Sequence, residues 1–299
     1  MLRIVVRDAV SDDFGQATDL LNRVWPFRVG SEQGLRHAVA GEPPDAHRRH
    51  WVAEDAGTLV GWATAKIEYQ SSARPGFLQV SVARESRGAG LGTALLERCD
   101  AHLADLGVVT AMTFTTQDEA SRTFAVARGF RHTNTTRISG VDPRTIEPPL
   151  VPSGVELRRL SELDPRKMYE LDAGTMADVP GEVSMDDVSF DQWFEDYWHH
   201  PEADLDASVA VVVDHIPVAF SYLRIGPGGR AVTDMTGTLR DYRGRGFALL
   251  AKRATLVNAA VGGIELVTTE NDETNAPMLR VNEKLGYQPL GSYAHWTRP

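Results

Sequence analysis

Arg87-Gly88-Ala89-Gly90-Leu91-Gly92 is the stretch that decides the fold, and a second version, Arg243-Gly244-Arg245-Gly246-Phe247-Ala248, lies 156 positions further along the chain. Each follows an apolar stretch and precedes apolar residues at helical spacing, so we expect a strand, a turn and a helix in that order. The first N–H groups of a helix have no partner within it, and glycine lets the backbone approach a ligand closely. The two stretches therefore predict two anion sites.

Other landmarks repeat at nearly the same spacing. Arg128-Gly129-Phe130 corresponds to Leu285-Gly286-Tyr287, and residues 59–63 correspond to residues 217–221. Landmarks that recur in one order predict an internal duplication of about 150 residues. The proline-rich stretch 142–153 should be extended, because proline removes a donor and disfavours helix in the residue before it. We therefore expect a domain at 1–141, a linker at 142–153 and a second domain at 154–299.

Strands and helices alternate within each copy. The first copy predicts strands at 51–53, 59–67, 77–82 and 108–115, and helices at 91–106 and 120–128. The second copy predicts strands at 209–213, 218–225, 233–239 and 264–269, and helices at 250–261 and 277–284. This order indicates an α+β or α/β fold in which each domain has a mixed central sheet flanked by helices.

An aromatic-rich stretch at 190–198 precedes His199-His200. Its spacing favours an amphipathic helix that packs on the sheet, and the alternative is the wall of a substrate pocket.

Composition excludes several classes of protein. The net charge of −10 argues against nucleic acid as a partner. Cys99 is the only cysteine, which fits a reducing compartment. No apolar run reaches the roughly 18–20 residues of a membrane span, and the N-terminus does not read as a signal peptide. We therefore expect a cytoplasmic protein with no membrane partner. The His and acidic residues show no paired metal-ligand spacing, so no metal is expected.

Two common phosphate-binding motifs do not fit the loops. A P-loop needs Lys and Ser or Thr after its second glycine, and neither loop has them. A dinucleotide fingerprint has the spacing G-x-G-x-x-G, whereas Gly88-Ala89-Gly90-Leu91-Gly92 reads G-x-G-x-G. A purely structural turn remains the alternative for either loop taken alone.

Arg87-x-x-Gly90-x-Gly92 and Arg243-x-x-Gly246-x-Ala248 resemble the Q/R-x-x-G-x-G/A signature of the GNAT acetyltransferases, whose loop wraps the pyrophosphate of acetyl-CoA. The resemblance implies two tandem GNAT domains with acetyl-CoA as the cofactor. The second half is similar to the C-terminal domain of tandem actinobacterial members of the family such as mycothiol synthase. The implied activity is N-acetylation of a small-molecule amine by direct attack on the thioester.

The same resemblance implies which residues contact the cofactor: the strand before each loop, the loop itself and the start of the helix. In the first domain these are Val80, Val82, Arg87, Gly88, Ala89, Gly90, Leu91, Gly92 and Thr93. In the second domain they are Thr236, Thr238, Arg243, Gly244, Arg245, Gly246, Phe247, Ala248, Asn271 and Asn275. An asparagine at a helix start is also an ordinary N-cap, so Asn271 and Asn275 have a structural alternative.

The second domain is expected to carry the chemistry, with Asp234 as the general base. Counting back nine residues from each loop arginine gives Asp234 in the second copy and Leu78 in the first. A carboxylate can accept the proton of the attacking amine and a leucine cannot. Glu270 is the reserve candidate. Many family members have a tyrosine acid five residues before the closing aromatic residue, but Ala125 and Asn282 stand there in this chain.

Two other functions fit the sequence. One is a protein or peptide N-acetyltransferase, and the other is a non-catalytic acyl-CoA-binding sensor. The chain is expected to be a monomer or a homodimer.

Overall fold

The computed structural model describes residues 4–176, 179 and 188–299. The chain forms two compact units, which we call unit 1 and unit 2. Unit 1 comprises Met1–Thr135 and Tyr293–Pro299, and unit 2 comprises Thr136–Ser292. Each unit contains one copy of the glycine-rich loop.

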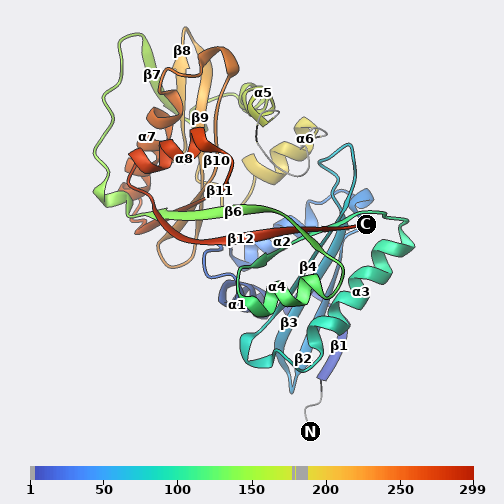
Figure 1. The fold of residues 1–299 in the computed structure, drawn as a ribbon. Helices are drawn as coiled ribbons and strands as arrows, with labels where there is room; N and C mark the ends of the chain where they lie inside the picture. Colours follow the sequence, from blue (N-terminus) through green and yellow to red (C-terminus); the bar gives the residue numbers. More distant parts are fainter. Residues whose placement is uncertain (1–3, 177–178, 180–187) are drawn as a thin grey trace. The chain divides into compact units, whose positions relative to one another are not determined.

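Unit 1 is built on a mixed sheet (Figure 1). Its strands lie in the order β1 (Ile4–Asp8), β2 (Arg49–Asp55), β3 (Thr58–Ile67), β4 (Gly76–Val82), β5 (Ala111–Thr116) and the end of β12 (Gln288–Arg298). Only β4 and β5 run parallel, and the other neighbours are antiparallel. A parallel pair needs a crossover, and the helix that follows the first loop supplies it.

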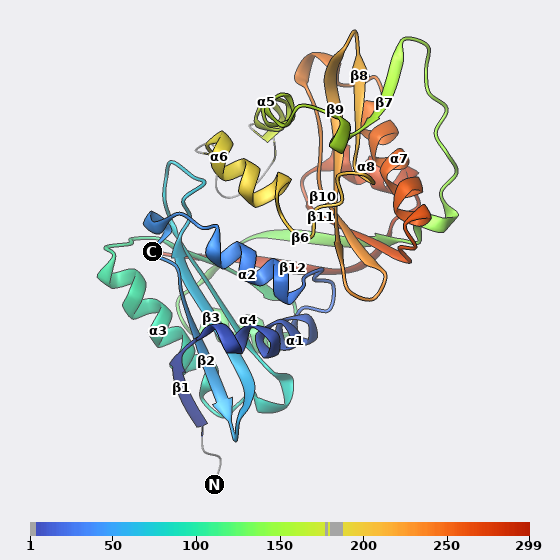
Figure 2. The same ribbon diagram turned by 180° about the vertical axis from the view of Figure 1, so that it is seen from behind.

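Helices cover both faces of this sheet (Figures 1 and 2). They are α1 (Phe14–Val24) and α2 (Glu32–Ala40) on one face, and α3 (Leu91–Asp105) and α4 (Glu119–Val126) on the other. The apolar stripe of α3 packs on the sheet through Leu91, Leu95 and Cys99, which are at most 3% exposed. The buried thiol of Cys99 is a core group.

Unit 2 repeats this plan. Its strands lie in the order β6 (Arg131–Val141), β11 (Leu266–Asp272), β10 (Arg230–Thr238), β9 (Ile216–Gly226), β8 (Val209–Val213) and β7 (Val155–Arg159). Its helices are α5 (Pro165–Met176), α6 (Phe190–Trp193), α7 (Phe247–Val261) and α8 (Ala276–Lys284). A π-helical turn at Phe194–Trp198 continues α6, so the aromatic stretch is helical and packs on the sheet as the sequence indicates. Only β10 and β11 are parallel in this unit.

The mixed sheets flanked by helices confirm the fold class expected from the sequence. The strands and helices predicted in both copies are present, with boundaries that differ by a few residues.

The units do not follow the predicted ranges, because two strands exchange partners near the boundary. Residues 136–141 of β6 pair with β11 of unit 2, and residues 293–298 of β12 pair with β5 of unit 1. Ala294 and Trp296, each 3% exposed, lie in the core of unit 1. The proline-rich stretch 142–153 thus connects β6 to β7 within unit 2, and Leu150 in it is 95% exposed.

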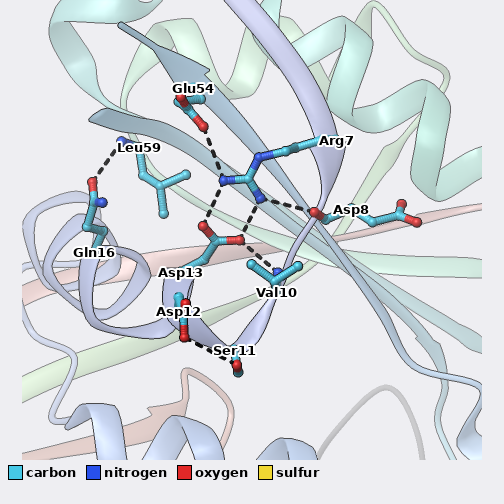
Figure 3. A network of polar contacts seen from close by, with 9 residues as sticks. All are labelled: Arg7, Asp8, Val10, Ser11, Asp12, Asp13, Gln16, Glu54 and Leu59. Carbon is cyan, nitrogen blue, oxygen red and sulfur yellow. Dashed lines mark hydrogen bonds and ion pairs between the residues drawn. The ribbon is translucent and has the colours of Figure 1, made fainter. Parts of the chain in front are cut away.

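A partly buried polar network anchors β1 within unit 1 (Figure 3). The Arg7 guanidinium donates two hydrogen bonds to the Asp13 carboxylate, at 2.7 and 2.8 Å, and one to Glu54 at 3.1 Å. Asp13 also accepts from the Val10 N–H at 2.7 Å. The hydrogen bond from Arg7 is the main cause that lowers the pKa of Asp13. The network ties β1 to the start of α1 and to β2.

Candidate functional site

Both glycine-rich loops adopt the same backbone conformation. Gly88 and Gly90 have φ of 82° and 83°, and Gly244 and Gly246 have φ of 77° and 81°. These are left-handed conformations that glycine adopts without strain. Gly90 and Gly246 are the N-caps of α3 and α7, and neither supplies a side-chain hydrogen bond to the helix. The first N–H groups of both helices are therefore directed toward the loops, as an anion site requires.

The two loop arginines hold the loops in place in the same way. The Arg87 Nε donates to the Val82 carbonyl at 3.4 Å, and the Arg243 Nε donates to the Thr238 carbonyl at 3.0 Å. Each bond joins the end of a strand to the turn that follows it. The duplicated geometry explains why arginine recurs at this position.

Arg87 also connects the first loop to α4. Its Nη1 lies 3.3 Å from the Asp118 carboxylate, and Asp118 caps α4 through the Ser121 N–H at 3.0 Å. Burial alone would raise the pKa of Asp118, but hydrogen bonds from Thr116 and Ser121 and the charge of Arg87 lower it to about 2. Asp118 therefore stays ionised and keeps the loop and α4 together.

Strands β4 and β5 separate after a short pairing. Only Gly76 and Phe77 of β4 have partners in β5. The Gly76 N–H points toward β5 and donates to the Thr110 carbonyl, whereas the Ala83 N–H points toward β3 and donates to the Val60 carbonyl. Since backbone groups alternate along a strand, the even-numbered Val80 and Val82 direct their N–H and C=O groups into the gap. These are the two β4 residues that the sequence predicts to contact a cofactor.

A cavity of about 390 Å³ occupies this gap and extends to the first loop. Its walls come from β4, β5, the loop, α3 and α4. From the predicted set, Val80, Val82, Arg87, Gly88, Gly90, Gly92 and Thr93 line it. The structure thus brings together most of the residues predicted for the first domain. Ala89 and Leu91 lie outside the lining, and Leu91 is a core residue at 3% exposure.

Gln79 places an unused acceptor in the cavity wall. It is 7% exposed, and its Nε2 donates to the Phe114 carbonyl of β5 at 3.1 Å. Its Oε1 is buried and has no hydrogen-bond partner among the described residues. A buried acceptor without a donor is costly, so this oxygen fits a ligand N–H. Trp25, whose indole N–H donates to the Ser81 hydroxyl at 2.9 Å, also lines the cavity.

Gly92 and Thr93 shape the other wall. A Cβ on Gly92 would lie 3.1 Å from the Phe124 ring, so this glycine allows α4 to approach α3. The Arg128 guanidinium stacks on the Phe124 ring, with its central carbon 3.6 Å from the ring centroid. Arg128 also donates to the Thr93 hydroxyl. Gly92 is therefore a packing residue as well as part of the cavity lining.

Asp234 of unit 2 does not occupy the counterpart of Leu78. The pairing of β10 with β9 shifts between Thr233 and Met235, so Asp234 is the extra residue of a β-bulge. The register makes Thr233 the counterpart of Leu78 and Met235 the counterpart of Gln79. The exposed Asp234 carboxylate lies 3.5 Å from the Arg224 guanidinium. Counting residues back from the loop cannot reveal an inserted residue. The sequence therefore paired Asp234 with Leu78, whereas the strand register pairs Thr233 with it.

The reserve base, Glu270, follows Thr269 on β11, where β10 and β11 separate. Burial by the surrounding protein raises its pKa to about 7, and the charge of Asp234 adds to the effect. Its side chain nevertheless remains accessible to solvent.

A buried lysine distinguishes the interior of unit 2. The Lys252 ammonium, in a residue 1% exposed, donates to the Thr269 hydroxyl at 3.1 Å and to the Asn282 side chain at 2.8 Å. Asn282 in turn donates to Asn271 at 2.6 Å. The predicted cofactor residue Asn271 is thus bonded to α8. By the spacing of the two loops, Leu96 is the counterpart of Lys252, and it lies in the apolar core of unit 1.

Several of the other predicted residues of unit 2 have structural partners. Asn275 caps α8 by accepting from the Met278 N–H at 3.3 Å, which is its structural alternative. The Thr236 hydroxyl lies 3.2 Å from that of Ser221. The Arg245 guanidinium lies over the Tyr242 ring. Gly244, Gly246 and Ala248 form the second loop and the first turn of α7, and Phe247 is a core residue.

Several residues of the cavity could not be predicted from the sequence. No local spacing joins these residues: Trp25 follows the end of α1, and Gln79, Phe114 and Phe124 lie in β4, β5 and α4. Asp118 could have been found, because an Asp just before a predicted helix start is an N-cap signal.

Comparison with known families decides what fold surrounds the cavity. Residues 16–130 match the acetyltransferase (GNAT) family. A tandem GNAT protein from the clavulanic acid biosynthesis pathway superimposes with a TM-score of 0.78 at 21% identity, over 99% of this chain and 98% of that one.

The chain has a tandem GNAT fold.

Two other solved structures share this fold. A GNAT (GCN5-related N-acetyltransferase) protein from Sphaerobacter thermophilus gives a TM-score of 0.76 at 18% identity, covering 99% of this chain and 96% of that one. A glucosamine N-acetyltransferase region of a fungal β-N-acetylglucosaminidase gives 0.69 at 17% identity, covering 99% of this chain and 38% of the larger protein. No curated protein sequence matches the chain. Within the described residues of this chain, no helix is long and apolar enough to cross a membrane, and no cluster could hold a metal ion.

Proposed function

We propose that the protein is an acetyl-CoA-dependent N-acetyltransferase whose unit 1 binds the acetyl-CoA. The observation that carries this proposal is the cavity of about 390 Å³ between β4 and β5, which reaches the glycine turn before α3. The segment that matches the GNAT family, residues 16–130, makes up most of the unit that contains it.

The open backbone groups support an extended thioester arm. The N–H and C=O groups of Val80 and Val82 face the gap, so amide groups of a pantetheine arm can pair with them as a strand would. The buried Gln79 Oε1 offers a further acceptor. The glycine turn and the start of α3 would take the pyrophosphate. An N–H of β4 near Val82 is the donor that we propose for the thioester oxygen.

The acceptor amine would enter through a neighbouring groove. This groove of about 880 Å³ shares Val24, Arg87, Thr116 and Ala120 with the cavity. Glu85 and Glu119 line it. The net charge of −10 for the whole chain favours a cationic amine as the substrate. We therefore propose a small-molecule amine as the acceptor, and peptide amines are the competing substrate class.

Removal of the amine proton would use water. An alkylamine is almost fully protonated at pH 7, so the proton must leave before or during attack. None of the described residues that line the cavity is Asp, Glu or His. We therefore propose that water in the adjoining groove accepts the proton. The leaving thiolate needs no strong acid, because a thiol has a pKa of about 8.5.

The second unit remains a predicted second site. Its loop has the same geometry, and the bulge at Asp234 leaves backbone groups unpaired, as a thioester site would need. The polar network of Lys252 and the ion pair of Asp234 with Arg224 argue for a structural role instead. The similarity of this half to mycothiol synthase and the cytoplasmic location also remain predictions.

The test is release of free thiol from acetyl-CoA with a panel of small amines. The proposal expects amine-dependent release, whereas a non-catalytic sensor would bind acetyl-CoA without turnover. The turnover of Asp234→Asn shows which of the two units carries out the acetyl transfer. Turnover within about twofold of wild type supports unit 1, and a fall of about 10²–10⁴ would assign the base to Asp234.

A further inference from the structure

Unit 2 contains a small cavity that the acetyl-transfer proposal does not use. It has a volume of about 20 Å³ and lies among α5, α6, the π-helical turn and the sheet strands β9 and β10. This space holds one water-sized group. The same aromatic residues form a separate core cluster, which the helix α7 and the glycine loop do not enter. The cavity is therefore independent of the loop of unit 2.

A buried carboxylate faces this cavity. Asp172 of α5 is 7% exposed and belongs to the lining. Its Oδ2 accepts from the Trp193 indole N–H at 2.7 Å. Its Oδ1 is buried and has no hydrogen-bond partner within the described part of the chain. A buried oxygen that could accept a bond and does not receive one points to a missing donor.

The surroundings of Asp172 lack a positive charge. Among the described residues, no lysine, arginine or histidine forms an ion pair with it. Arg224 of β9 already interacts with two other carboxylates, those of Glu202 at 2.7 Å and Asp234 at 3.5 Å. Burial raises the pKa of Asp172 to about 6, and the charge of Asp234 contributes to the rise. The carboxylate is thus still mostly ionised at pH 7, and an uncompensated buried charge is costly.

Aromatic rings surround the remaining space. Trp193 lies 5.7 Å from Trp198 and 6.4 Å from Tyr197, measured between ring centroids, and all three line the cavity. The Tyr222 hydroxyl is bonded to the Tyr197 carbonyl at 2.6 Å, which fixes two walls relative to each other. Aromatic faces carry negative potential and attract cations. The π-helical turn that presents Tyr197 and Trp198 is a rare feature that often occurs at functional sites.

We propose that this cavity binds the primary ammonium group of a small molecule, with Asp172 as its counter-ion. The ammonium donates to Oδ1 and lies against the rings of Trp193, Tyr197 and Trp198. A volume of about 20 Å³ admits one ammonium group and excludes a quaternary ammonium group. The rest of the ligand lies outside the cavity.

The experiment titrates the full-length protein with methylammonium chloride and follows the indole N–H resonance of Trp193 by NMR, assigned with Trp193→Phe. The proposal expects a saturable shift of that resonance. Methanol, an uncharged molecule of the same size, and sodium chloride at equal ionic strength should give no saturable shift. These three titrations use the wild-type protein, so their results do not depend on whether a variant folds.

Asp172→Asn keeps the shape of the side chain and removes its charge. It should weaken methylammonium binding at least about tenfold, because a desolvated charge pair is lost. Asp191→Asn, which removes an exposed carboxylate on α6, is the matched control and should leave the affinity unchanged. The proposal is overturned if wild type shows no saturable shift, if methanol gives the same shift, or if Asp172→Asn binds as tightly as wild type. Each of these results would mean that Asp172 is not the counter-ion of an ammonium group.

Discussion

Replacing Lys252 by Met should change how the stability of unit 2 depends on pH. Burial lowers the pKa of Lys252 from 10.5 to about 7 in the folded protein. Between those values the unfolded chain binds a proton that the folded chain does not bind, so wild-type stability falls as the pH drops from about 10 to 7. Below pH 7 both states are protonated and this contribution is constant. In Lys252→Met the contribution is absent at every pH.

The size of the effect follows from the contacts of the ammonium group. At about 1.4 kcal/mol per pKa unit, the lowered pKa sets an upper limit of about 5 kcal/mol. The hydrogen bonds to Thr269 and Asn282 favour the charged form and offset part of it. We therefore expect the difference in free energy of unfolding between variant and wild type to change by about 1–3 kcal/mol from pH 10 to pH 7. Loss of the donor to Asn282 costs stability equally at all pH values and cancels in this comparison.

The assay is urea unfolding of both proteins at pH 7, 8, 9 and 10, followed by circular dichroism and tryptophan fluorescence. Leu96→Met is the matched control, because Leu96 is the apolar counterpart of Lys252 in unit 1. The control should parallel wild type across the pH range. If the free energies of unfolding of Lys252→Met and wild type change with pH in parallel, the prediction is wrong, because the buried ammonium group then titrates normally.

Three further predictions concern unit 1. Asp13→Asn should lower its free energy of unfolding by about 1–3 kcal/mol at pH 7. This difference in free energy of unfolding should narrow below about pH 4, because the unfolded chain then binds a proton at Asp13 that the folded carboxylate, with its lowered pKa, does not yet bind. Urea unfolding at both pH values checks this. Gly92→Leu should displace the Phe124 ring and weaken acetyl-CoA binding at least about tenfold in calorimetry, with Ala248→Leu as the unit 2 control. Deleting residues 293–299 removes Trp296 from the core and should abolish cooperative unfolding of unit 1, measured by near-ultraviolet circular dichroism.

The loops were predictable because their chemistry is local. Gly88, Gly90, Gly244 and Gly246 occupy left-handed conformations that a short sequence can specify, and each arginine bonds to a strand five residues earlier. The strand before each loop was predictable from its alternation, and so was the helix after it from its spacing.

Long-range features were not predictable in this way. Trp296 completes the core of unit 1 although about 180 residues separate it from its partner Thr115, and only the exchange of β12 brings them together. Asp234 was misaligned because a bulge adds one residue without any local signal. Asp172 was not predicted, because a single Asp within a helix is usually a surface residue and its burial depends on the tertiary fold.

Calorimetry of acetyl-CoA binding to wild type, Gly90→Val and Gly246→Val tests most directly whether unit 1 binds acetyl-CoA. The two glycines have φ of 83° and 81°, and each caps the helix after its loop, so the substitutions impose equal backbone strain in the two units. We expect Gly90→Val to lose the acetyl-CoA binding that the cavity of unit 1 supports, and Gly246→Val to retain it. Loss of binding in Gly246→Val with full binding in Gly90→Val would contradict this assignment and place acetyl-CoA in unit 2.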